Sequence, residues 1–133
     1  MKRYLSLFLS LFVMSSCYAD IVIYTSHRYP VNEPPPHIQV VYIDAQEKLE
    51  DEIFNNLSAV SDIAEEQAKE IINSPEWEEY EKQLIELSNG MLKAWELKLK
   101  KIPAIVFNEK YVVYGTTDIE YAENRLRRYL NEK

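Results

Sequence analysis

Four runs of apolar and β-branched residues along the chain predict β-strands. They occupy residues 20–25, 37–43, 102–107 and 111–114. The first run is almost continuously apolar, which is typical of a strand buried on both faces of a sheet. Only three residues separate the last two runs, a connection length suited to a β-hairpin. The pattern therefore predicts two separate strands early in the chain and a hairpin near its end.

Apolar residues at helical spacing fill the stretch between the second and third strands. Asp44 is a favourable N-cap for a helix over residues 45–57, and Ser61 begins a second helical pattern. Ser74 as N-cap and Pro75 at the first helical position predict the start of a third helix. Its large apolar residues recur at steps of three and four: Trp77, Tyr80, Leu84, Leu87, Met91 and Trp95. This stripe is typical of a helix side that faces a core, and an exposed aromatic contact patch is the alternative.

Proline and glycine positions complete the predicted order of elements. Residues 26–36 hold four of the six prolines, which predicts an extended connection between the first two strands. Gly90 predicts a kink or an early end of the third helix. A last helix is predicted over residues 118–131, with arginines near its C-terminal end. The order of strand, loop, strand, helices, hairpin and helix predicts one α/β domain in which helices cover a mixed sheet.

Residues 1–19 have the layout of a secretory signal peptide. Two basic residues precede an apolar run over residues 4–14, and small residues follow up to Ala19. A permanent bilayer span needs about 20 apolar residues, so this run is too short for one, and no later run approaches that length. Cleavage after Ala19 predicts an exported mature domain of residues 20–133 without a stable membrane span.

Cys17 offers a second interpretation of this segment, in which it accepts a lipid. Met14 disfavours that interpretation, because lipoprotein signals are expected to carry Leu at that position. With cleavage after Ala19 the mature domain contains no cysteine, so it would work in an oxidising compartment without a thiol.

Composition argues against several classes of function. The chain has 15 Lys and Arg against 22 Asp and Glu, a net charge of −7, which leaves no obvious source of the cationic surface that binds nucleic acid. Only two glycines occur, so no Gly-rich loop is present to hold a nucleotide. His27 and His37 lie ten residues apart and outside any zinc-ligand spacing. Four glutamates of the third helix spread around its surface as a solvated face rather than a metal site: Glu76, Glu78, Glu79 and Glu81. We therefore expect neither a cofactor nor a metal ion.

The stretch from Lys101 to Gly115 resembles the C-terminal half of a thioredoxin fold. In that fold an Ile-Pro pair, here Ile102 and Pro103, opens the third strand with the proline in cis; a hairpin, a glycine and a closing helix follow. The resemblance implies a thioredoxin-like mixed sheet. Oxidoreductases of that fold carry a Cys-x-x-Cys pair at the end of the first strand, where this chain has Thr25 to Arg28. Without sulfur at this position, dithiol chemistry is excluded.

Three segments resemble, more narrowly, small exported proteins encoded by bacterial integrating conjugative elements. They are residues 93–122 (KAWELKLKKIPAIVFNEKYVVYGTTDIEYA), residues 24–31 (YTSHRYPV) and residues 41–45 (VYIDA). One departure is that Lys98 and Leu99 stand where other members often carry Gly after Ala-Trp-Leu. The resemblance implies a periplasmic, thioredoxin-like component linked to conjugative transfer through a type IV secretion system.

The Ile-Pro signature also suggests a groove for an extended peptide between the loop after the first strand and the turn before the third. Its predicted residues are Thr25, Ser26, His27, Arg28, Lys101, Ile102 and Pro103. The competing interpretation is that Pro103 only shapes the edge of the sheet. His27 is interpreted as a solvated loop histidine rather than a catalytic one, because no nucleophile stands at a suitable spacing.

Two functions of different class remain open at this point. The first is a noncatalytic component of the conjugation apparatus that contacts other secretion-system or periplasmic proteins. The alternative is a thiol-independent periplasmic isomerase or chaperone, or a redox accessory protein.

Overall fold

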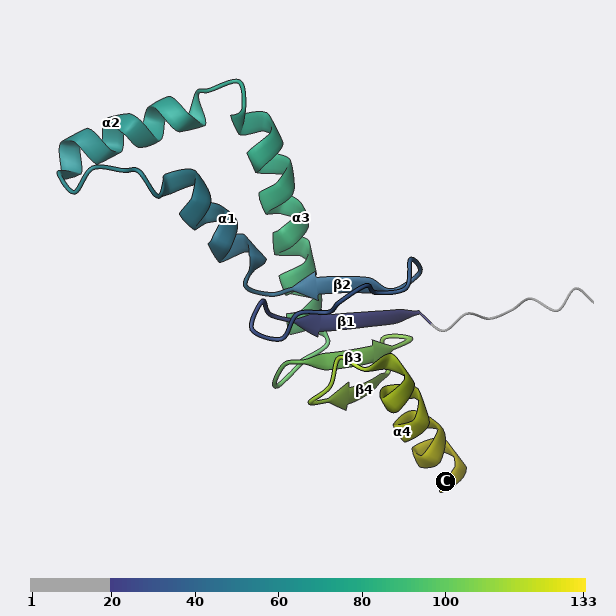
Figure 1. The fold of residues 1–133 in the computed structure, drawn as a ribbon. Coiled ribbons are helices and arrows are strands. Elements are labelled where there is room, and N and C mark those ends of the chain that lie inside the picture. The colour runs from purple at the N-terminus through teal and green to yellow at the C-terminus, as the bar shows by residue number, and fades with distance from the viewer. Residues whose placement is uncertain (1–19) are drawn as a thin grey trace, which may run out of the picture.

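The computed structural model describes residues 20–133, and the predicted signal peptide and Cys17 lie outside them (Figure 1). In the described part the elements follow the order that the sequence pattern predicts. Their bounds are β1 (Ile21–Thr25), β2 (Gln39–Tyr42), α1 (Ala45–Phe54), α2 (Ser61–Ile72), α3 (Trp77–Glu96), β3 (Ala104–Phe107), β4 (Tyr111–Tyr114) and α4 (Ile119–Asn131).

The strands form one mixed sheet in the order β2-β1-β3-β4. β1 pairs parallel with β2 and antiparallel with β3, and β3 pairs antiparallel with β4. β1 and β3 are therefore central, and Ile23 and Ile105, which pair across them, are completely buried. Both faces of a central strand are covered, which is why these two runs are continuously apolar. The mixed sheet with its helices confirms the α/β fold.

The second half of the sheet has the features that the thioredoxin-like fold implies. The Ile102–Pro103 peptide bond is cis and lies just before β3. A hairpin joins β3 to β4, and Gly115 follows β4 with φ at 85°, a left-handed conformation that favours glycine. α4 then packs back on the sheet through Ala122, which is completely buried.

The two faces of the sheet are covered by different parts of the chain. On one face Ile21, Ile23, Ile105 and Phe107 form the core together with Ala122 of α4. Ile38, which directly precedes β2, belongs to the same cluster, and Val31 of the proline-rich connection packs against it. On the other face the C-terminal half of α3 crosses the sheet, and its Gly90 lies directly against Val41 of β2. Successive strand residues point to opposite faces, so each strand contributes to both layers.

The three helices α1, α2 and α3 form a helical arm (residues 45–96) that projects from the sheet (Figure 1). Only the C-terminal part of α3 reaches the strands, and α1 packs beside α3. α1 buries Leu49 alone, and no residue of α2 or α3 is fully buried. The sheet is therefore covered by α3 and α4, whereas α1 and α2 extend beyond it. Among the described residues no helix combines the length and apolarity that a bilayer span requires.

α3 differs from its prediction in three respects. It runs without interruption through Gly90, where a kink or an end was predicted. It begins at Trp77 rather than at Pro75: the Ser74 carbonyl oxygen accepts from the Trp77 N–H (3.2 Å) in a preceding turn, and Ser74 does not cap the helix. The predicted stripe is half-buried as far as Leu87, but Met91 and Trp95 are exposed. Beyond Gly90 the half-buried residues of α3 are Lys93 and Ala94, so a different side of the helix faces the sheet there.

Candidate functional site

The seven residues predicted to form a partner groove lie at one end of the sheet. β1 ends at Thr25, and Tyr24 pairs with Ala104 at the start of β3. Because the register continues along the paired strands, Thr25 lies next to Pro103, which immediately precedes β3. The structure thus brings residues 25–28 and 101–103 to the same end.

Thr25 and Ser26 shape the turn after β1. Thr25 is completely buried, and its hydroxyl donates to the Tyr29 carbonyl oxygen at 2.7 Å. The Ser26 carbonyl oxygen accepts from the Tyr29 N–H at 2.9 Å. A buried hydroxyl needs such a partner, and this one closes the turn on itself. Thr25 is therefore a structural residue of the turn rather than part of an open surface.

His27 is held in place by two neighbours from the end of β2. Its backbone N–H donates to both carboxylate oxygens of Asp44, at 3.1 and 3.0 Å, and its Nδ1 lies 2.9 Å from Asp44 Oδ1. Its ring stacks on Tyr42, with centroids 4.6 Å apart and an interplanar angle of 26°. The side chain remains 41% exposed, so the imidazole presents one edge to solvent in a fixed orientation.

Asp44 has a role different from the predicted N-cap. It precedes α1, but its carboxylate makes no capping hydrogen bond there and binds His27 instead. Burial raises the pKa of the Asp44 carboxyl, but the hydrogen bonds from the side chain and backbone of His27 outweigh it and lower the pKa below its ordinary value. The carboxylate is therefore charged at neutral pH and ties the loop after β1 to the end of β2.

The remaining predicted residues have distinct surroundings. Arg28 is exposed at the tip of the turn. The Lys101 ammonium lies 5.8 Å from the centroid of the Tyr114 ring, within the range of a cation–π contact. The Pro103 carbonyl oxygen accepts from the Gly115 N–H at 2.8 Å, which continues the β3–β4 ladder by one step. Lys101 and Pro103 thus connect the start of β3 to the end of β4.

A cavity of about 290 Å³ opens beside Ile102 and faces α3. It is lined by Ile43, Met91, Ala94, Trp95, Lys101 and Ile102, among others. The Ile43 N–H also donates to the Thr25 carbonyl oxygen at 2.9 Å, so this cavity adjoins the end of β1. Trp95 is 79% exposed at its rim. Two of the predicted groove residues, Lys101 and Ile102, therefore line a cavity whose other side is α3.

The sequence did not identify the residues of two surfaces, although an exposed aromatic contact patch that includes Trp95 was the stated alternative to a core-facing stripe. One is an exposed apolar stripe on α3, formed by Ile85, Leu92 and Trp95, which are 55%, 53% and 79% exposed. The other is an open cavity between β4 and α4, and four of its nine lining residues are tyrosines. The abundance of tyrosine was the available signal for the second surface, but composition alone does not say which tyrosines gather. Within residues 20–133 no group of three His, Cys, Asp or Glu side chains is placed to hold a metal ion.

Comparison with known proteins places the chain in a family. Residues 18–132 match the family described as "Protein of unknown function (DUF1525)", so the match covers all but the last of the described residues. No curated protein matches the chain. No solved structure matches it either. The chain therefore belongs to the DUF1525 family of proteins of unknown function.

Proposed function

We propose that this protein is a noncatalytic component of a conjugative transfer apparatus, a type IV secretion system encoded by an integrating conjugative element. It acts in the periplasm through contacts with other proteins. The observation that carries the proposal is the exposed apolar stripe on α3, which nothing within residues 20–133 covers.

The α3 stripe has the spacing of a docking surface. Ile85 and Leu92 are seven residues apart and Trp95 follows three residues later, so all three lie near one side of the helix. Tryptophan is enriched among the residues that dominate binding energy at protein interfaces. The cavity beside Trp95 offers a recess for an apolar side chain of the partner.

Charge indicates the kind of partner that the stripe accepts. The helical arm (residues 45–96) holds 14 Asp and Glu against four Lys, whereas residues 97–133 hold five against eight Lys and Arg. Glu81 lies four residues before Ile85 and Glu96 four residues after Leu92, so both flank the stripe. A partner surface that is apolar at its centre and basic around it complements this arrangement.

The link to conjugative transfer rests on the sequence resemblance, and the structure gives the resembling segments a common location. Residues 24–31 and 41–45 supply His27 and Asp44 at the end of the sheet. Residues 93–122 supply Trp95 and the start of β3 beside them. Because the three resembling segments lie at the same end of the sheet, their location supports the proposal that they form one contact surface.

A transfer assay tests the proposal. Donor cells that carry the element but lack this gene are complemented with the wild-type protein, with Trp95→Ala or with Leu130→Ala, and transfer frequency and protein level are measured. We expect loss of transfer without the gene, and Trp95→Ala to restore about one tenth of the wild-type frequency or less because it removes an interface anchor. Leu130, which is 45% exposed on α4, serves as the matched control and should restore transfer fully.

Two results would contradict the proposal. The first is normal transfer in the absence of the gene. The second is turnover by the purified protein in a disulfide-reduction or prolyl-isomerase assay, which would favour the alternative of an enzyme or redox accessory.

A further inference from the structure

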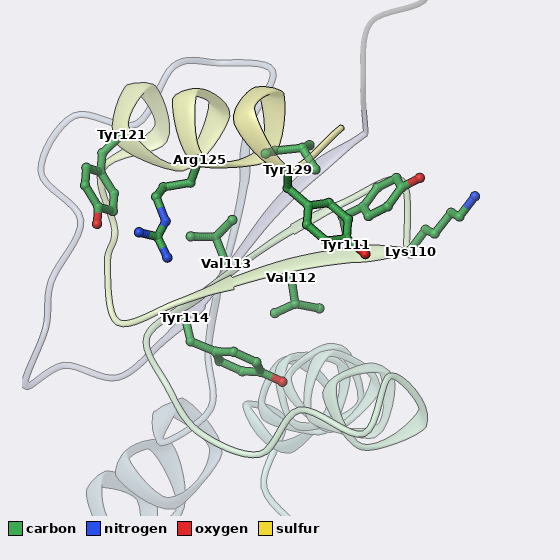
Figure 2. Close-up of a pocket in the computed structure, with 9 residues that line it drawn as sticks. Lys110, Tyr111, Val112, Val113, Tyr114, Tyr121, Arg125 and Tyr129 are labelled. Atoms are coloured by element: carbon green, nitrogen blue, oxygen red, sulfur yellow. The ribbon is translucent and has the colours of Figure 1, made fainter. Parts of the chain in front are cut away.

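The open edge of the sheet carries a second surface, distinct from the α3 stripe. β4 is one of the two edge strands of the sheet, the other being β2, and α4 lies along β4 on one face. A cavity of about 520 Å³ follows β4 between the two elements. Figure 2 shows Tyr121, Arg125 and Tyr129 directed from α4 toward the strand. The lining includes every residue of β4 from Tyr111 to Tyr114, so this groove follows the strand and suits an extended chain.

The backbone of β4 is able to pair with another strand along this groove. In an antiparallel ladder, hydrogen-bonded and non-hydrogen-bonded pairs alternate. The Gly115 N–H donates to the Pro103 carbonyl oxygen at 2.8 Å, so Gly115 and Pro103 form a hydrogen-bonded pair. Val113, two residues before Gly115, therefore forms the next hydrogen-bonded pair, with Ile105 of β3. Val112 and Tyr114 then direct their N–H and C=O groups away from β3, toward the open edge. These groups are the ones that an added strand would use.

The groove is aromatic and cationic. The Tyr111 and Tyr129 rings meet edge to face with centroids 6.4 Å apart. The Lys110 ammonium lies 5.1 Å from the centroid of the Tyr111 ring. Arg125 forms no ion pair within residues 20–133, although its side chain reaches into the groove (Figure 2). A guanidinium without a carboxylate partner is suited to bind one from another molecule.

We propose that the β4 edge binds an acidic, extended segment of a partner protein as an additional strand. Main-chain hydrogen bonds to Val112 and Tyr114 hold the segment, and its carboxylates pair with Lys110 and Arg125. The proposal rests on the proposed role as an interaction protein, but it uses a different surface and does not need the α3 stripe. A second copy of the chain is a poor occupant, because pairing two β4 edges would bring their Arg125 and Lys110 side chains toward each other.

Binding of synthetic peptides to the purified protein tests this inference. The probe is a fluorescent peptide of about ten residues that alternates glutamate with valine, measured by anisotropy. Two control peptides carry lysine in place of glutamate, or N-methyl groups at every second backbone nitrogen. We expect the glutamate peptide to bind and both controls to bind at least about tenfold more weakly, because one lacks the charge and the other the hydrogen bonds.

Variants on α4 separate the groove from general charge. Arg125→Glu should weaken binding of the glutamate peptide at least about tenfold, because it reverses the charge inside the groove. Arg127→Glu makes the same change in net charge on an exposed residue outside the cavity lining and should stay within about twofold of wild type. Hydrogen exchange should show protection of the Val112 and Tyr114 amides when the peptide is bound.

Three outcomes would overturn the inference. They are equal affinity for the lysine and glutamate peptides, equal effects of the two arginine substitutions, and dimerisation of the protein through β4 in the absence of peptide. Because the assay uses purified protein, its failure leaves the transfer assay with Trp95→Ala unaffected. Conversely, normal transfer without the gene would leave peptide binding at β4 intact.

Discussion

The carboxylate of Asp44 accepts hydrogen bonds from His27, 17 residues earlier in the sequence, and so connects the loop after β1 to the end of β2. We expect Asp44→Asn to lower the free energy of unfolding by about 1 kcal/mol at pH 7, because hydrogen bonds to a charged acceptor are replaced by bonds to a neutral one. The pKa of Asp44 is lower in the folded protein than its ordinary value of 3.8. The stabilisation is therefore present above about pH 4 and is lost as the pH falls through the folded pKa.

Urea unfolding at pH 7 and near pH 3 measures this difference. The gap between wild type and Asp44→Asn should narrow at the lower pH. Asp51→Asn, which alters an exposed carboxylate of α1 without a hydrogen-bonded partner among the described residues, should change stability little at either pH. A gap that is independent of pH would show that the charge of Asp44 does not hold the loop.

Two aspartates show which hydrogen bonds the sequence predicts and which it does not. The sequence predicts a helix that starts at Asp118, and the Asp118 carboxylate accepts from the Tyr121 N–H at 2.9 Å, because capping partners lie within one turn. Asp44 has the same residue type before a helix, yet its partner is His27 from a distant loop. Local patterns describe local hydrogen bonds, and the choice between the two partners is made by the fold.

At the scale of elements, α3 docks on β2 through a residue without a side chain. A Cβ placed at Gly90 would lie 2.8 Å from Val41 Cγ1. Gly90→Ala gains about 1 kcal/mol of helix propensity but overpacks a contact against a stiff β-branched side chain, which costs about 1–3 kcal/mol. We expect a net loss of roughly 1 kcal/mol of stability, measured by thermal or urea unfolding.

A second variant, Val41→Ala, tests whether the contact between residue 90 and Val41 causes this loss of stability. In the Val41→Ala background the side chain that a Cβ at residue 90 would meet is shortened, so Gly90→Ala should stabilise the protein by about 1 kcal/mol through helix propensity alone. The same sign in both backgrounds would mean that α3 does not rest on β2 at this point.

The sequence predicts the position of each helix and strand more accurately than it predicts which surfaces pack together. Continuous apolar runs indicate central strands, as in β1 and β3. An amphipathic stripe shows that a helix has an apolar side, but the stripe does not identify the surface it meets. For this reason the sequence predicts helices on the sheet, whereas α1 packs on α3 and α2 lies at the far end of the helical arm. Which residues at the end of α3 are exposed, Trp95 among them, depends on the contact between Gly90 and Val41. That contact joins segments that are distant in the sequence.

At the scale of the whole molecule, the chain divides into a well-buried sheet and an arm with almost no interior. Nearly all fully buried residues lie on the strands or against them, among them Ile23, Ile105 and Phe107. The helical arm carries 14 Asp and Glu against four Lys, whereas residues 97–133 carry five Asp and Glu against eight Lys and Arg. The two proposed surfaces therefore differ in the sign of their charge, and the two proposals call for a basic partner at the α3 stripe and an acidic one at the β4 edge.

This division predicts how the molecule opens locally. α2 buries no residue, so few contacts oppose its unfolding, whereas β1 and β3 open only when the core is lost. We expect amide hydrogen exchange in α2 to be more than about tenfold faster than in β1 and β3, measured by mass spectrometry or NMR. α4, a helix of similar length that buries Ala122 against the sheet, is the matched control and should exchange at an intermediate rate. Equal rates in α2 and α4 would mean that the helical arm is as stable to local unfolding as the sheet and α4. The exposed apolar residues of α3 would then not be explained as a partner-binding surface on a loosely packed arm.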